Sequence, residues 1–175
     1  MPHWDHRVTA RVLLSLLCGI QGLATLVIDL NRTHATNPLW PGHARLHLVW
    51  QSMTVALVSI VALCLLWSPS ALGLSSDQRF FLAALLASVS CFGFLLAFLG
   101  RRLYAGTLSD PNGIPPLHVS VAGRTFAFDM NLVAIVVALL SLAFLLALYM
   151  HERDPRHRNA VPIQLPPPYG ASSTG

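Results

Sequence analysis

The chain has 175 residues, of which 54% are hydrophobic and only 10% are charged. Soluble domains carry about one quarter charged residues, so this composition excludes an ordinary water-soluble globular protein. The formal net charge is +4, but the basic residues stand singly or in pairs beside apolar segments, which argues against nucleic acid as a partner.

Four apolar segments dominate the chain, and each is long enough to cross the hydrocarbon core of a bilayer, which requires about 20 residues. They are Val12–Leu30, Leu46–Trp67, Phe80–Gly100 and Met130–Met150. The first segment continues without a small-residue cleavage site, so we predict a retained span rather than a signal peptide. Small residues such as Gly22 and Gly93 would let the helices approach closely in lipid. The sequence therefore predicts an all-α integral membrane protein, built as a compact four-helix transmembrane bundle.

The bundle accounts for residues 1–150, and the segment 151–175 has a different composition. It combines arginines with a Pro-Pro-Pro-Tyr-Gly stretch and small polar residues, a composition that cannot build a core, so we predict a disordered tail. The three cysteines, Cys18, Cys64 and Cys91, lie inside apolar segments without CxxC spacing and are predicted to be buried packing residues.

An even number of spans places the first and third loops on the same side of the membrane, whichever way the protein is inserted. Six arginines lie in the N-terminal segment, second loop and tail, and five lie in the first and third loops. This small excess favours both termini in the cytoplasm. We expect a multi-pass protein of a bacterial cell membrane.

The first loop and the start of the second span carry the densest polar chemistry of the chain. Three histidines, His34, His43 and His47, fall within fourteen residues. Pro41 suits the first turn of a helix, so the second helix is expected to begin before the hydrocarbon does. His43, His47 and Gln51 would then follow one helical stripe at spacings of four residues, with Trp40 and Trp50 near the interface.

Three interpretations of these histidines stay open. Imidazoles one helical turn apart could bind a metal ion together with His34. A neutral histidine and a carboxylate could instead carry protons to and from a lipid-like substrate, because the charge of histidine changes near neutral pH. In the third interpretation, the histidines, Arg45 and the tryptophans only anchor the helix among the lipid headgroups.

Charged residues at the ends of the other spans also require an explanation. Asp29 lies near the end of the first span, where an ionisable group is costly unless it is paired or faces a polar cavity. Asp129 precedes the fourth span and could cap that helix at Asn131 or Leu132. Arg101 and Arg102 end the third span, where their positive charges interact favourably with the negative end of the helix dipole and could hold a lipid phosphate.

The third loop is the longest, and loops of this length in compact proteins are often functional. Its Ser109–Pro116 stretch is dense in turn-forming residues. The alternation that follows, on both sides of Ala122-Gly123, predicts a small β-hairpin that caps the mouth of the bundle. Because both loops share one side, four residues of this loop are expected to complete one cavity with the histidines: Asp110, Asn112, His118 and Arg124.

The string Thr-His-x-x-Asn-Pro-x-Trp-Pro-x-His-Ala-Arg-x-His, from Thr33 to His47, resembles a largely uncharacterised family of small four-span bacterial and fungal membrane proteins. The Asp-Pro-Asn-Gly-Ile-Pro stretch that begins at Asp110 also looks like that family. The chain has Gly42 where the family pattern has a second proline. The resemblance implies a four-span layout and supplies no activity.

A looser likeness, in the number of spans and in an acid that ends the first helix, is to the EXPERA group of sterol isomerases and sigma-2-type receptors. It implies an intramembrane cavity for a sterol-like or isoprenoid molecule. Asp29 and a histidine would then be the candidates for proton transfer.

These observations predict a membrane protein whose polar cavity at one face binds or converts a hydrophobic, lipid-like molecule, by proton transfer if it is an enzyme. One alternative is a non-enzymatic accessory subunit of a larger membrane complex, and another is a metal-dependent oxidoreductase with the metal on His34, His43 and His47. Otherwise no cofactor is predicted. Expected partners are the bilayer, the small molecule, and a membrane protein or second copy of the chain.

The candidate catalytic residues are His43, His47 and Asp29. The candidate ligand-binding residues are His34, Asn37, Trp40, Arg45, Gln51, Arg101, Arg102, Asp110, Asn112, His118, Arg124 and Asp129.

Overall fold

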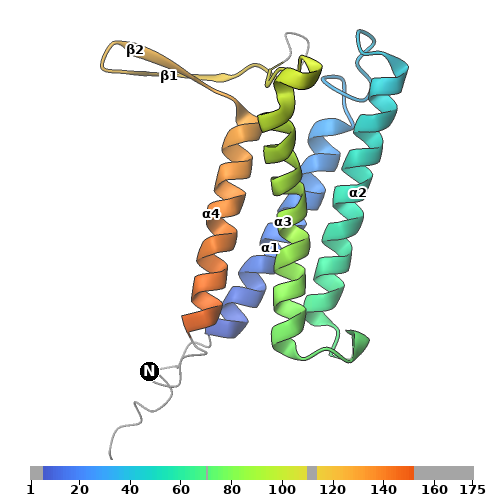
Figure 1. Ribbon diagram of the computed structural model, residues 1–175, viewed down its shortest axis with the longest axis vertical. Coiled ribbons are helices and arrows are strands. Elements are labelled where there is room, and N and C mark those ends of the chain that lie inside the picture. Colours follow the sequence, from blue (N-terminus) through green and yellow to red (C-terminus); the bar gives the residue numbers. More distant parts are fainter. Residues whose placement is uncertain (1–5, 70, 110–113, 152–175) are drawn as a thin grey trace, which may run out of the picture.

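The computed structural model describes residues 6–69, 71–109 and 114–151. Its elements follow in the order α1 (His6–Asp29), α2 (Gly42–Trp67), the 3-10 turn η1 (Ala71–Gly73), α3 (Ser76–Gly100), the 3-10 turn η2 (Arg101–Tyr104), β1 (Leu117–Val121), β2 (Arg124–Phe128) and α4 (Met130–His151). All four α-helices are long and apolar enough to cross a membrane (Figure 1). The predicted transmembrane four-helix bundle with a hairpin in its third loop is confirmed. Of the predicted tail, His151 ends α4, and the rest lies outside the described residues.

Local sequence signals explain where two of the helices begin. Helix α2 starts at Gly42, directly after Pro41 and before the apolar span, as expected. Helix α3 starts four residues before the predicted span, because Ser75 and Gln78 form a capping box. The Gln78 backbone N–H donates to Ser75 Oγ at 3.2 Å, and the Ser75 backbone N–H donates to Gln78 Oε1 at 2.9 Å. Two backbone donors at the helix start are thereby satisfied.

Helices α1 and α2 form the closest pair of the bundle. Gly22 of α1 is buried against α2, and a Cβ atom added to it would lie 3.0 Å from Ser59 Cβ. Small residues at such contacts let two backbones approach closely in lipid, where association depends on packing rather than on escape from water. The two helices are therefore held together along much of their length.

The apolar core lies in the half of the bundle next to the second loop and the chain termini, which we call the loop-two end. Its buried members are Ala10, Leu14, Cys18, Ala62, Leu66, Phe80, Ala83, Ala84, Ala87, Leu142, Leu145 and Tyr149. The rings of Phe80 and Tyr149 stack with centroids 3.8 Å apart and an interplanar angle of 6°. All four helices meet here, so this end fixes their arrangement.

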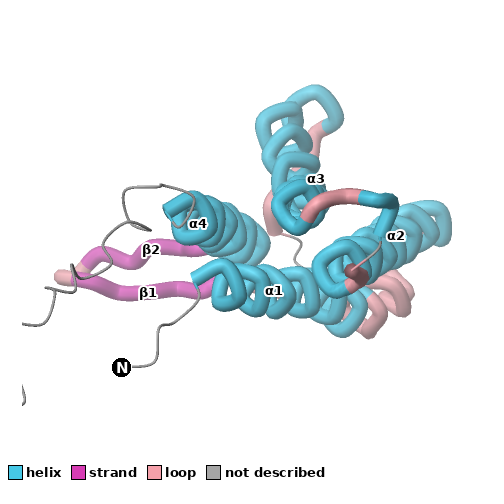
Figure 2. Tube along the Cα trace, turned by 90° about the horizontal axis from the view of Figure 1, so that it is seen from below, coloured by secondary structure: helices cyan, strands magenta, loops and turns pink. Residues whose placement is uncertain are grey.

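The opposite end, which carries the first loop and the hairpin and which we call the hairpin end, is packed differently. Within the described helices, α3 contributes no buried side chain after Cys91 and α4 contributes none before Ala138. Figure 2, seen from the loop-two end, shows the helices spreading apart with distance, with α3 running away from α1 and α4. All four helices therefore pack closely at the loop-two end, whereas at the hairpin end the close packing is between α1 and α2.

The cysteines follow this packing with one exception. Cys18 and Cys91 are buried as predicted, whereas Cys64 is exposed. Cys64 precedes the buried Leu65, and consecutive residues of an α-helix point about 100° apart, so residue 64 falls on the outer face of α2. The prediction that all three cysteines are buried is wrong for Cys64.

The predicted hairpin is present, and its turn has the required geometry. Strands β1 and β2 pair antiparallel, and the turn residues Ala122 and Gly123 have φ angles of +49° and +77°. Positive φ at both central positions is typical of the type I′ turns that match the twist of two paired strands. The hairpin extends sideways from the start of α4 instead of covering the mouth of the bundle (Figure 1).

Candidate functional site

A polar stripe follows the inner side of α1 toward the hairpin end. Gln21, Thr25 and Asp29 are spaced by four residues, so they lie along one face of the helix. Gln21 Nε2 donates to Cys91 Sγ of α3 at 3.4 Å, and Ser52 Oγ of α2 donates to Asp29 Oδ2 at 2.8 Å. The stripe on α1 therefore contacts α3 through Gln21 and α2 through Asp29, and it faces the region where α2 and α3 separate.

The hydrogen bond from Ser52 offsets part of the energetic cost of placing the ionisable Asp29 near the end of a span. Ser52 is fully buried, Asp29 is partly exposed, and the Asp29 backbone C=O also accepts a hydrogen bond from the Ala35 N–H at 2.9 Å. Within the described part of the chain, Asp29 Oδ1 has no hydrogen bond. A carboxylate held through one oxygen keeps the other for a ligand or a proton.

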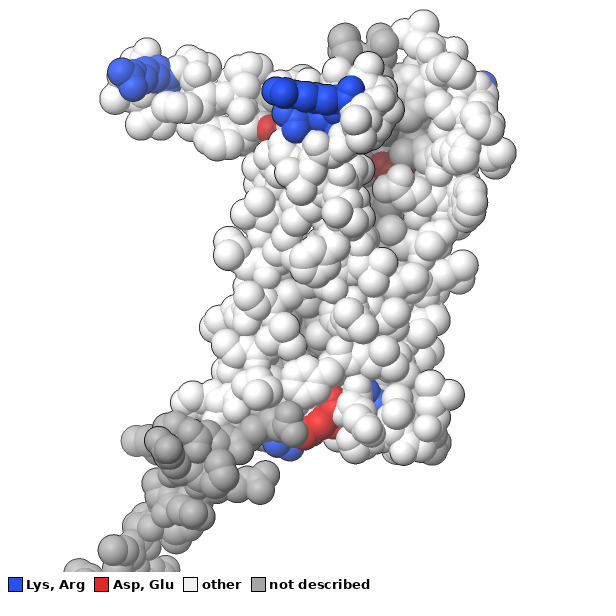
Figure 3. All heavy atoms as spheres, viewed as in Figure 1, with Lys and Arg blue, Asp and Glu red and all other residues white. Residues whose placement is uncertain are grey.

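Segments 92–100 of α3 and 130–137 of α4 lie apart from the α1–α2 pair. We call the space between these segments and that pair the opening. In Figure 3 the surface at the hairpin end is hollowed between α2 and α3, and an acidic group lies in the hollow. A shallow pocket of about 100 Å³ lies at the end of α3, lined by residues of α3 and of the segment that follows it, among them Phe94, Phe98, Arg101 and Tyr104. Gln21 and Asp29 are polar groups on the α1 side of the opening.

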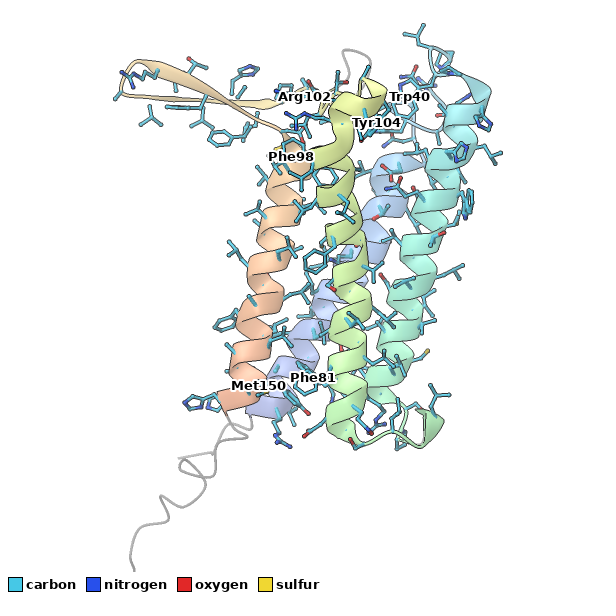
Figure 4. All side chains as sticks on the ribbon, viewed as in Figure 1. Trp40, Phe81, Phe98, Arg102, Tyr104 and Met150 are labelled. Atoms are coloured by element: carbon cyan, nitrogen blue, oxygen red, sulfur yellow. The ribbon has the colours of Figure 1, made fainter. Side chains whose placement is uncertain are left out.

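The end of α3 is held in place by its own side chains. Arg101 Nη1 donates to the Phe98 C=O at 2.9 Å, and its guanidinium lies 4.2 Å from the centre of the Phe98 ring. The Tyr104 hydroxyl donates back to the Ala97 C=O at 2.6 Å. Figure 4 shows Phe98, Arg102 and Tyr104 gathered at this end, and Arg102 is exposed.

His43 and His47 lie on one helical stripe, as predicted. Their Nε2 atoms are 3.0 Å apart, and the His47 ring stacks on Trp50 with centroids 5.9 Å apart. Both histidines and Gln51 are exposed on α2. His47 lies about 140° around the helix from the buried Ser52. The structure records no contact between this pair and Asp29.

The rest of the first loop is folded around itself. Thr33 Oγ1 lies 2.7 Å from His34 Nδ1, and the His34 ring meets the Trp40 ring edge to face with centroids 5.2 Å apart. Asn37 is buried, and its Oδ1 accepts the Leu39 N–H at 3.0 Å. Arg45 is half-buried on the first turns of α2. His34 and Asn37 thus shape the loop.

The remaining predicted site residues are dispersed. Asp129 Oδ1 accepts the Leu132 N–H at 2.9 Å, which confirms the predicted cap of α4. His118 and Arg124 are exposed on the hairpin, away from the bundle. Asp110 and Asn112 lie outside the described residues.

The loop-two end carries a second polar cluster that the sequence interpretation missed. Arg7 Nη1 lies 3.4 Å from Asp77 Oδ1, and the Tyr149 hydroxyl donates to the same oxygen at 2.7 Å. Arg11 donates to Ser76 Oγ, and Arg79 is buried. The Ser75-x-x-Gln78 capping signal could have placed Asp77 in the first turn of α3, but no local pattern pairs it with Tyr149.

Within the described ranges, no group of three or more His, Cys, Asp or Glu residues is placed to hold a metal ion. The three histidines of the metal interpretation are therefore not assembled: the His34 ring lies against Thr33 and Trp40, whereas His43 and His47 lie together on α2. No family model, curated protein or solved structure matches the chain.

Proposed function

We propose that this integral membrane protein binds a hydrophobic, lipid-like small molecule in the opening at the hairpin end. The observation that carries the proposal is the one-sided packing: α3 after Cys91 and α4 before Ala138 bury no side chain. Segment 92–100 spans about 13 Å at 1.5 Å per residue, enough for a ring system or short isoprenoid chain. The likeness to the EXPERA group is a second reason to choose this ligand class.

The polar stripe of α1 suits the polar end of such a ligand. Binding sites for small molecules are mostly apolar with a few polar groups that fix orientation. Gln21 and Asp29 supply such groups, and Phe94 and Phe98, which line the pocket at the end of α3, would supply apolar contacts next to the opening. If the ligand is converted, Asp29 would accept a proton through Oδ1, since Ser52 holds Oδ2. His43 and His47 remain the predicted proton carriers near the water phase.

The proposal predicts that filling the opening removes the ligand. Thr25→Trp places an indole on the polar stripe, whereas Val27→Trp places one on the same helix at a position that is 64% exposed and faces outward. We expect co-purified small molecule, measured by native mass spectrometry, to fall about tenfold or more in T25W and to be unchanged in V27W. Asp29→Asn should keep the shape of the site and abolish turnover if the protein is a proton-transfer enzyme.

Equal ligand content in the two tryptophan variants would contradict the proposed site. If instead the wild-type protein carries no small molecule and co-purifies with one stoichiometric membrane protein, the accessory-subunit function is supported. Circular dichroism and gel filtration of both variants verify that the helices and the monodisperse state survive the substitutions.

The His43–His47 pair supports a second candidate function, transient binding of a divalent transition metal. Their Nε2 atoms are 3.0 Å apart, at hydrogen-bond distance, which is close to the separation of about 3.3 Å between two nitrogens bound to one tetrahedral ion at about 2.0–2.1 Å each. Two ligands leave most of the coordination sphere to water or a substrate, as in sites that keep open positions.

This second candidate predicts Zn²⁺ binding in calorimetric titration of the purified protein. His43→Ala should weaken that binding at least about tenfold, because one of two chelating groups is lost. His118→Ala, which removes an exposed histidine of β1, should leave it unchanged. Identical titrations for the wild type and H43A would remove the metal function.

A further inference from the structure

The β-hairpin has one apolar face and one polar face. Its register pairs Leu117 with Phe128, Val119 with Phe126 and Val121 with Arg124. Residues directly opposite each other in a β-ladder point to the same side of the sheet, and the side alternates along each strand. One face therefore carries Leu117, Val119, Val121, Phe126 and Phe128, with Arg124 beside the turn, and the other carries His118, Ser120, Thr125 and Ala127.

The apolar face is not covered by the protein. Its five hydrophobic side chains are between 37% and 57% exposed, and every residue of both strands is exposed. An isolated two-stranded hairpin is at best marginally stable in water, and it needs packing on one face. In Figure 1 the strands extend to one side of the described helices, so the bundle does not cover them.

The hairpin lies directly beside the start of a membrane-crossing helix. Only Asp129 separates β2 from α4, and its cap fixes the point where the membrane-crossing helix begins. Figure 1 shows the hairpin extending sideways from the start of α4, across the direction of the helices, at the level where this apolar helix begins. The first residue of α4, Met130, is itself exposed, so the lipid-facing surface of the helix continues into the hairpin.

We propose that the hairpin lies in the lipid interface, with its apolar face against the acyl chains and its polar face toward water. The free edges of the two strands remain satisfied there, because headgroups and water supply hydrogen bonds that the hydrocarbon does not. Arg124 at the turn would extend to the headgroup phosphates, as long basic side chains do at membrane surfaces. Figure 3 shows basic groups at the tip of the hairpin and at the end of α3, on the same level.

Adjacent residues on opposite faces give a direct test. We would introduce Val119→Cys and Ser120→Cys separately into the full chain carrying Cys64→Ala, attach a nitroxide label, and reconstitute both in zwitterionic vesicles. Power-saturation electron paramagnetic resonance then compares access of oxygen, which concentrates in lipid, with access of a water-soluble nickel complex. We expect the oxygen-to-nickel accessibility ratio at position 119 to exceed that at position 120 severalfold.

A label at Leu140→Cys, which is 66% exposed on α4, provides the lipid reference, and unchanged helical circular dichroism verifies folding. High nickel access at both hairpin positions would overturn the proposal, because the apolar face would then be in water. Protection of position 119 from both reagents would also overturn it, because a protein partner or a second copy of the chain would then cover the face. Neither outcome depends on whether the opening binds a ligand.

Discussion

Replacing Gly22 by leucine is expected to lower the thermal stability of the protein markedly. A Cβ atom at this position already comes within 3.0 Å of Ser59 Cβ and 3.1 Å of Ser59 Oγ, so a larger side chain must push α1 and α2 apart. Overpacking of this kind costs about 1–3 kcal/mol and occasionally more. Leucine gains only roughly 0.8 kcal/mol over glycine in helix propensity, so the steric cost decides the sign.

Gly19→Leu on the same helix is the matched control for this prediction. Nothing lies within 4 Å of a Cβ atom added to Gly19, so the substitution gains helix propensity without a clash. The measurement is the temperature at which half of the detergent-solubilised protein is lost from the monodisperse peak after heating. If G22L and G19L melt together, the close α1–α2 contact does not contribute to stability.

Phe80→Ala is the second substitution with a large expected effect. Phe80 is 1% exposed and stacks on Tyr149, which is also 1% exposed, so alanine leaves a cavity where all four helices meet. In lipid the removed ring loses packing contacts but little transfer energy, because the surrounding hydrocarbon is as apolar as the core. We expect a loss of roughly 2–4 kcal/mol in the free energy of unfolding, toward the lower part of the range for buried aromatic residues.

The same residue type on the same helix supplies the control. Phe92 is 55% exposed, so Phe92→Ala removes a ring that faces outward and should change the free energy of unfolding by less than about 0.5 kcal/mol. Unfolding by a denaturing detergent, followed by circular dichroism, compares the two variants. Similar losses in F80A and F92A would show that the core is not concentrated at the loop-two end.

Hydrophobic patterning predicted the four helices and the hairpin because these depend on local sequence. The predicted C-terminal ends lie within one residue of those observed: Asp29, Trp67, Gly100 and His151. The N-terminal ends of α1, α2 and α3 extend beyond the predicted apolar spans, and Pro41 and the Ser75 capping box explain the starts of α2 and α3. The alternation around Ala122-Gly123 was sufficient to predict the strands.

The arrangement of the polar groups was less accessible to sequence reasoning. Partners distant in the chain, such as Asp29 with Ser52 or Asp77 with Tyr149, depend on how the helices cross, which no periodicity specifies. The histidine stripe was predicted, but its exposure was not, because three polar residues one turn apart fit the inner and the outer side of a helix equally well. The direction of the hairpin likewise depends on the backbone at Asp129 rather than on the strand pattern.

The uneven contacts among the helices also carry a consequence for biogenesis. Since α1 and α2 pack through Gly22 and Ser59 and are joined by a loop that folds on itself, they can pair as soon as both have entered the bilayer. Helix α3 can then pack on α2 and helix α4 on α1, and the Phe80–Tyr149 stack joins α3 to α4 near the loop-two end. We therefore expect assembly in the membrane to start from the α1–α2 pair and to leave the hairpin ends of α3 and α4 apart from that pair.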